Sequence, residues 1–79
     1  MNLYVFQEVL SDYTDGMAII SAETLEDAQQ IAYTEFSWAE DADVSGFLTR
    51  EPGFRMPVAT YSVGSDVVAG VRHVIWGGA

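Results

Sequence analysis

"ETLEDAQQIAYTEF" (residues 23–36) decides the fold, because it carries the clearest periodic pattern in the chain. Apolar side chains recur at helical spacing and make one stripe: Leu25, Ala28, Ile31, Ala32, Phe36 and Ala39. Thr24 is the expected N-cap, and the acids Glu26 and Asp27 lie where the positive end of the helix dipole favours them. We therefore predict an amphipathic helix at about 24–38 whose apolar stripe packs on a core.

Two strands are predicted before this helix. Residues 3–10 ("LYVFQEVL") and 17–22 ("MAIISA") are rich in β-forming side chains. The segment between them, "SDYTDG", ends in Asp15-Gly16, a dipeptide that suits the positive φ angles of a tight turn. The pattern predicts a β-hairpin that turns at 11–16.

The chain after the helix predicts a connection and two further strands. Residues 44–57 contain two glycines and two prolines, which favours a connection with one short strand at 47–50. Strands are expected at 58–63 and 67–76, around a turn. The order ββαββ predicts one α+β domain over residues 1–79: a small antiparallel sheet of about four strands with one helix packed on one face.

The first strand raises the question of what covers the other face of the sheet. Its apolar residues alternate on both faces, with Leu3, Val5 and Val9 on one and Tyr4, Phe6 and Leu10 on the other. One helix covers only one of these faces. Three covers stay open at this point: the 44–57 connection with its phenylalanines, a second copy of the chain, or a partner protein.

Charge excludes several classes of function. The chain has twelve Asp and Glu residues, three arginines and no lysine, which gives a net charge of −9. Binding to DNA, RNA or an anionic membrane needs clustered Lys or Arg, so we expect no direct nucleic-acid and no membrane partner. No basic leader and no apolar run of membrane-spanning length are recognisable, and cysteine is absent, so the expected location is the cytoplasm.

No enzyme is predicted. His73 is the single histidine and stands within a predicted strand, which is typical of a structural histidine. With Gly16 set at the invariant glycine of a calcium loop, the ligand positions fall on Ser11 and Tyr13, so that motif fails. We expect no catalytic residue, no cofactor and no metal ligand.

The candidate functional residues are acids at the end of the predicted helix: Glu35, Glu40, Asp41 and Asp43. Each acid near a helix C-terminus costs about 0.3–1 kcal/mol, so their presence needs a reason. One interpretation is a solvated loop that keeps the protein soluble. The other is a contact with a basic partner surface, in which Trp38 is the apolar anchor and the hairpin acids Asp12 and Asp15 form a second contact.

Size, charge and pattern together suggest a family. A short, acidic, lysine-free chain with the strand-to-helix segment "MAIISAETLEDAQQIA" (17–32) resembles the small phage- and mobile-element-encoded inhibitors of bacterial defence, in particular anti-CRISPR proteins. The resemblance implies a partner, the basic nucleic-acid groove of a Cas effector complex in the host cytoplasm, and an inhibitor that blocks target DNA binding as a DNA mimic or steric plug.

Two alternatives stay open. One is a structural or assembly module that dimerises through an uncovered sheet face. The other is a small antitoxin-like regulator that binds a different basic partner. The protein is accordingly expected to be a monomer or a homodimer.

Overall fold

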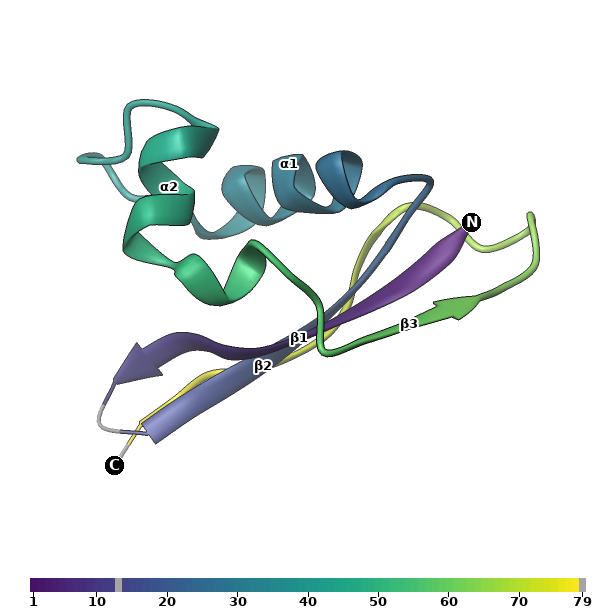
Figure 1. Ribbon diagram of the computed structural model, residues 1–79, viewed down its shortest axis with the longest axis horizontal. Coiled ribbons are helices and arrows are strands. Elements are labelled where there is room, and N and C mark those ends of the chain that lie inside the picture. Colours follow the sequence, from purple (N-terminus) through teal and green to yellow (C-terminus); the bar gives the residue numbers. More distant parts are fainter. Residues whose placement is uncertain (13, 79) are drawn as a thin grey trace.

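A computed structural model describes residues 1–12 and 14–78, with the backbone alone given for Asp12. Within these residues the chain forms a four-stranded antiparallel sheet and two α-helices (Figure 1). The strands are β1 (Asn2–Asp12), β2 (Thr14–Ala22), β3 (Ala59–Ser62) and β4 (Gly70–Ile75). The helices are α1 (Leu25–Phe36) and α2 (Val44–Arg50), followed by a 3₁₀ turn, η1 (Pro52–Phe54). The predicted α+β class and the antiparallel four-stranded sheet are confirmed.

Helix α1 lies where the periodicity predicts it. The Thr24 hydroxyl accepts a hydrogen bond from the Asp27 backbone N–H at 3.1 Å, which confirms the N-cap. Ala28, Ala32 and Phe36 are buried, while Leu25 and Ile31 pack at the edge of the core. The helix ends at Phe36, so Ala39 is an exposed loop residue and not part of the stripe.

The predicted single helix is wrong, because α2 occupies the place of the expected connection. The Asp43 side chain caps α2 by accepting the Gly46 backbone N–H at 2.8 Å. Gly46 therefore lies in the first turn of α2, where its N–H has no acceptor within the helix, and it does not interrupt the helix. The short strand expected at 47–50 is helical, with Phe47 fully buried against the core.

The two strands expected around a turn after the helix do not pair as a hairpin. Strands β3 and β4 do not pair with each other; β3 pairs with β1 and β4 pairs with β2, in the sheet order β3-β1-β2-β4. The segment between them crosses from one edge of the sheet to the other (Figure 1). The Ser21 hydroxyl fixes this segment, since it donates to the carbonyl of Val68 at 2.6 Å.

The first hairpin is longer than predicted. Gly16 pairs with Val9 inside the ladder and β1 continues to Asp12, so Asp15-Gly16 is strand and not turn. A Cβ at Gly16 would collide with the Ile75 carbonyl, so the glycine permits the close approach of β4. Tyr13, inside the predicted turn, lies outside the described residues.

One face of the sheet carries the whole helical layer. Helices α1 and α2 and the turn η1 all lie on the same side of the strands (Figure 1). Phe54 of η1 is at the centre of this core, with its ring centroid 5.1 Å from that of Phe6, 5.9 Å from Phe36 and 5.4 Å from Phe47. The 44–57 segment therefore adds to the layer that α1 forms and does not cover the second face.

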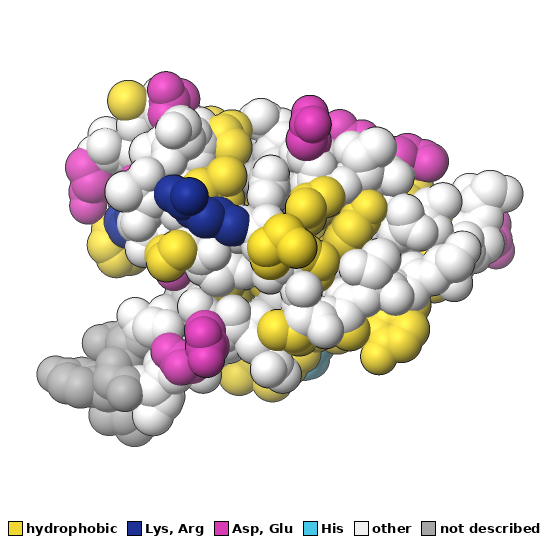
Figure 2. Space-filling model, in the orientation of Figure 1, with side chains coloured by type: hydrophobic (Ala, Val, Ile, Leu, Met, Phe, Trp, Pro, Cys, Tyr) yellow, Lys and Arg dark blue, Asp and Glu magenta, His cyan; other side chains and the backbone are white. Residues whose placement is uncertain are grey.

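The second face stays open in the single chain. Its apolar residues alternate along each strand with the residues that are buried under the helices, and they pair with one another across neighbouring strands. They are Leu3, Val5, Met17, Ile19, Tyr61 and Ile75. Tyr61 is 58% exposed and Ile75 is 49% exposed. Figure 2 shows hydrophobic side chains along this underside of the molecule. We call it the open sheet face.

Candidate functional site

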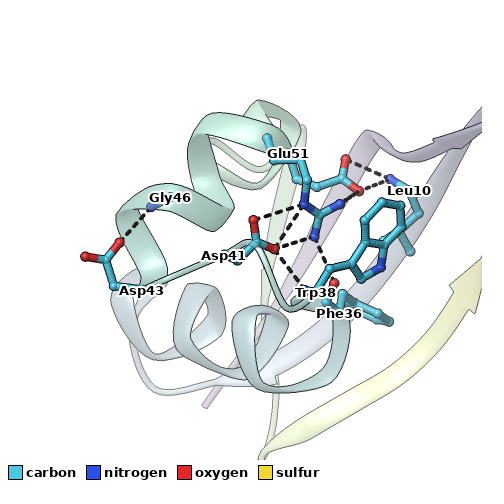
Figure 3. Close-up of polar contacts among 8 residues, drawn as sticks. Leu10, Phe36, Trp38, Asp41, Asp43, Gly46 and Glu51 are labelled. Carbon is cyan, nitrogen blue, oxygen red and sulfur yellow. Dashed lines mark hydrogen bonds and ion pairs between the residues drawn. The ribbon is translucent and has the colours of Figure 1, made fainter.

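The loop after α1 closes on Arg50, the last residue of α2 (Figure 3). The Asp41 carboxylate accepts from Arg50 Nε at 3.1 and 3.0 Å and from Nη2 at 2.7 Å. The same Nη2 donates to the carbonyl of Phe36, the last residue of α1, at 3.0 Å. A cation thus lies at the C-terminus of α1 and offsets part of the negative charge of the acids that the sequence places there.

Asp41 is an internal residue and not a surface acid. Its side chain is 4% exposed, and Oδ2 also accepts the Trp38 backbone N–H at 3.0 Å. The hydrogen bond from Arg50, followed by that from Trp38, lowers the pKa of Asp41 below its ordinary value of 3.8. Asp41 is therefore ionised at neutral pH and committed to holding the loop.

The other acids proposed as contacts lie in two places. Glu35, Glu40 and Asp43 are exposed at the end of α1 and along the loop to α2, and Asp43 also caps α2. Asp15 is exposed in the hairpin and accepts from the Ser11 hydroxyl at 2.6 Å; the side chain of Asp12 lies outside the described residues. In Figure 1 the loop after α1 lies above the joined ends of β1 and β2, at the same end of the molecule, so the two groups of acids form separate patches.

A pocket of about 390 Å³ opens beside Arg50. We call it the tryptophan pocket; its principal lining residues are Leu10, Phe36, Trp38, Arg50, Glu51 and Trp76. The Arg50 guanidinium lies over the Trp38 ring, with its central carbon 4.3 Å from the ring centroid. Trp76 contacts Phe36 edge-on, with the two ring centroids 5.5 Å apart. Trp38 and Trp76 are 58% and 57% exposed, so both indoles are available to a binding partner.

Glu51 is the buried anion of this pocket. Its side chain is 11% exposed, and both carboxylate oxygens accept the same Leu10 backbone N–H, at 3.1 and 3.0 Å. Leu10 presents that N–H from a left-handed backbone with φ of 53°, a conformation that non-glycine residues seldom adopt. Burial raises the pKa of Glu51, against the opposing effects of the Leu10 hydrogen bond and the charge of Arg50.

Of the residues that line this pocket, the sequence predicts Trp38 as a candidate contact but not Arg50, Glu51 or Trp76. The pattern places Arg50 in a strand, Glu51 in a connection and Trp76 at the end of a strand. The sequence does contain one indication of the role of Arg50. It is one of three cations in a chain with twelve acids, so a buried acid is expected to pair with one of these three arginines. The approach of Arg50 to Trp38 depends on the short helix α2, which the pattern does not predict.

The described residues show neither a metal cluster nor a membrane-spanning helix. Within residues 1–12 and 14–78, no three His, Cys, Asp or Glu side chains group as metal ligands. No helix in the same part of the chain is long and apolar enough to cross a membrane. Comparison with known proteins gives no match to any family model, curated protein or solved structure. Function is therefore inferred from the chemistry of these surfaces.

Proposed function

We propose that the protein is a non-enzymatic inhibitor that binds a basic nucleic-acid-binding surface of a bacterial CRISPR-Cas effector complex and blocks target DNA binding. The observation that supports this most is the distribution of charge. Among the acids with described side chains, nine are exposed: Glu8, Asp15, Glu23, Glu26, Asp27, Glu35, Glu40, Asp43 and Asp66. Arg55 and Arg72 are the exposed cations of that same part of the chain, since Arg50 is paired with Asp41.

Such a surface attracts a basic cleft over long range. Exposed carboxylates raise the rate of association with a positive groove and pair with the Lys and Arg side chains that otherwise hold phosphates. Figure 2 shows acidic side chains along the helical side of the molecule. Glu35 and Glu40 lie within three residues of the exposed Trp38 in the chain, whereas Asp43 lies at the opposite end of α2 from the tryptophan pocket (Figure 3). Charge and an apolar anchor together are typical of a tight protein interface.

Neutralising this patch tests the proposal. We expect the triple variant Glu35→Gln, Glu40→Gln, Asp43→Asn to inhibit about 10- to 100-fold more weakly at low salt, mainly through slower association. Asn at 43 keeps a side-chain oxygen for the cap of α2, so the fold is retained. The measurement is displacement of labelled target DNA from a guide-loaded effector complex.

The matched control removes the same charge elsewhere. Glu23→Gln, Glu26→Gln, Asp27→Asn neutralises three acids at the start of α1 and should weaken inhibition much less. Equal losses in the two variants would mean that only net charge matters. Unchanged inhibition in the first variant would exclude the patch as the contact.

A second candidate function, an assembly module, is favoured by the open sheet face. The ladder segments that form it, 3–7, 17–21, 59–61 and 73–75, contain no Asp or Glu in a chain with twelve. Two copies with net charge −9 would therefore meet there with the least repulsion.

Sedimentation at several salt concentrations distinguishes the two functions. Apolar self-association should strengthen as the salt concentration rises and should be abolished by Ile75→Glu. Binding of the acidic surface to a basic partner should instead weaken as the salt concentration rises. A monomer at all salt concentrations would exclude the assembly module.

A further inference from the structure

We propose that the tryptophan pocket binds one arginine side chain of the protein's partner, with the guanidinium paired to Glu51 and stacked on Trp76. This inference rests on the proposed function, because a basic nucleic-acid-binding surface supplies the arginine. It assigns to the pocket the residue that would anchor the complex, whereas the exposed acids supply attraction over long range.

The first reason is that Glu51 has too few donors. A carboxylate accepts about four hydrogen bonds, yet both oxygens of Glu51 share the single N–H of Leu10. Nη1 of Arg50 forms an ion pair with Oε2 at 3.7 Å, which is beyond hydrogen-bonding distance. Arg50 is itself neutralised by Asp41, so the pocket retains the negative charge of Glu51. A cationic guest would supply the missing donors.

The second reason is the pair of indoles. Arg50 already lies over Trp38 and makes a forked contact with Asp41, which shows the same combination of indole, guanidinium and carboxylate within the protein. Trp76 is similarly exposed and meets Phe36 by an edge contact, and no cation lies over it among the described residues. Glu51 and Trp76 line one pocket and thus form an unfilled counterpart of the Asp41–Trp38 pair.

The chemistry selects arginine over other guests. A planar guanidinium can stack on an indole and present two parallel N–H groups to one carboxylate, while a lysine ammonium offers a point charge. A phosphate or carboxylate guest would be repelled by Glu51, and an aliphatic one would bury the carboxylate without a donor. The volume of about 390 Å³ is at the small end of ligand pockets, about 300–1,000 Å³, and suits one side chain.

Tryptophan fluorescence provides the test, since both tryptophans of the chain line the pocket. The probe is N-acetyl-arginine methylamide, and its neutral isostere, N-acetyl-citrulline methylamide, is the control. We expect saturable binding of the arginine probe in the millimolar range, at least about tenfold tighter than the citrulline probe. Equal binding of the two probes, or no saturable change with arginine, would overturn the inference.

Two variants locate the binding. Glu51→Gln keeps an oxygen for the Leu10 N–H but removes the charge, and Trp76→Leu removes the stacking surface; each should weaken the arginine probe about tenfold. Glu26→Gln, an exposed acid at the start of α1 and outside the pocket lining, should bind within about twofold of the parent. Wild-type binding in Glu51→Gln would overturn the inference. If that variant does not fold, the indole N–H signals of the unmodified protein decide, because both must shift with the arginine probe.

The outcomes separate this inference from the proposed function. If the arginine probe binds while no effector complex loses its DNA, the proposed function fails and the pocket assignment stands. If an effector is inhibited equally by the parent, Glu51→Gln and Trp76→Leu, the pocket assignment fails and the proposed function stands.

Discussion

Replacing Phe54 by Ala is expected to lower the free energy of unfolding by about 3–5 kcal/mol. The side chain is fully buried and its ring contacts those of Phe6, Phe36 and Phe47, so one truncation removes packing between the sheet and both helices. The whole chain is expected to be stable by only about 4–12 kcal/mol, at roughly 0.05–0.15 kcal/mol per residue. The variant should therefore lose much of its stability margin.

Urea unfolding followed by circular dichroism measures this effect. Met56→Ala is the matched control, because Met56 is a large apolar residue close in sequence that is 71% exposed. Its loss should change the stability by less than about 0.5 kcal/mol. If Phe54→Ala unfolds at the same urea concentration as Met56→Ala, the account is contradicted and the Phe54 side chain is not buried in the core.

Arg50→Ala is expected to lower the free energy of unfolding by about 1.5–3 kcal/mol at neutral pH, the range for hydrogen bonds to charged groups. Arg50 joins three parts of the structure, since it donates to Asp41 and to the Phe36 carbonyl and lies near Glu51. Its removal leaves the carboxylate of Glu51 buried without a cation. It also removes the hydrogen bonds that hold the loop after α1 against α2. Arg50→Lys should recover only part of the loss, because an ammonium cannot make the forked contact.

The cost of Arg50→Ala should depend on pH. Because the pKa of Asp41 is lowered by Arg50, their pairing contributes fully to the stability of the folded protein above pH 3.8, and the contribution is lost as the pH falls from there through the lowered pKa. Glu51 acts in the same direction, since burial raises its pKa and protonation removes the charge that Arg50 otherwise offsets. The difference in unfolding free energy between the parent and Arg50→Ala should therefore be larger at pH 7 than at pH 3. An equal difference at both values would mean that packing against Trp38 dominates.

Local patterns of this sequence predict its longest elements and not their assembly. Twelve residues of α1 give enough turns for a stripe to be recognised, whereas the seven of α2 do not. Pro52 and Gly53 indicate a break, but they form η1, which seats Phe54 in the core. The positions of β3 and β4 on opposite edges depend on their long-range pairing with β1 and β2, which no local pattern contains.

The candidate site shows the same division. The acidic run after α1 is visible in the sequence, but the separate role of each acid is not: Asp41 is buried by Arg50 and Asp43 caps a helix. The two tryptophans meet at one pocket because α1 ends at Phe36 and β4 ends beside it, which requires the tertiary structure. The expected binding of a basic partner stays a prediction.

Displacement of labelled target DNA from guide-loaded CRISPR-Cas effector complexes by the unmodified protein tests the central proposal most directly. A panel that covers the effector types is titrated with the protein at low and at physiological salt, with folding confirmed by circular dichroism under each condition. We predict that at least one complex loses its DNA at near-stoichiometric protein, and that the inhibition weakens as salt rises. If every complex retains its DNA in the presence of excess folded protein, the inhibitor function is contradicted.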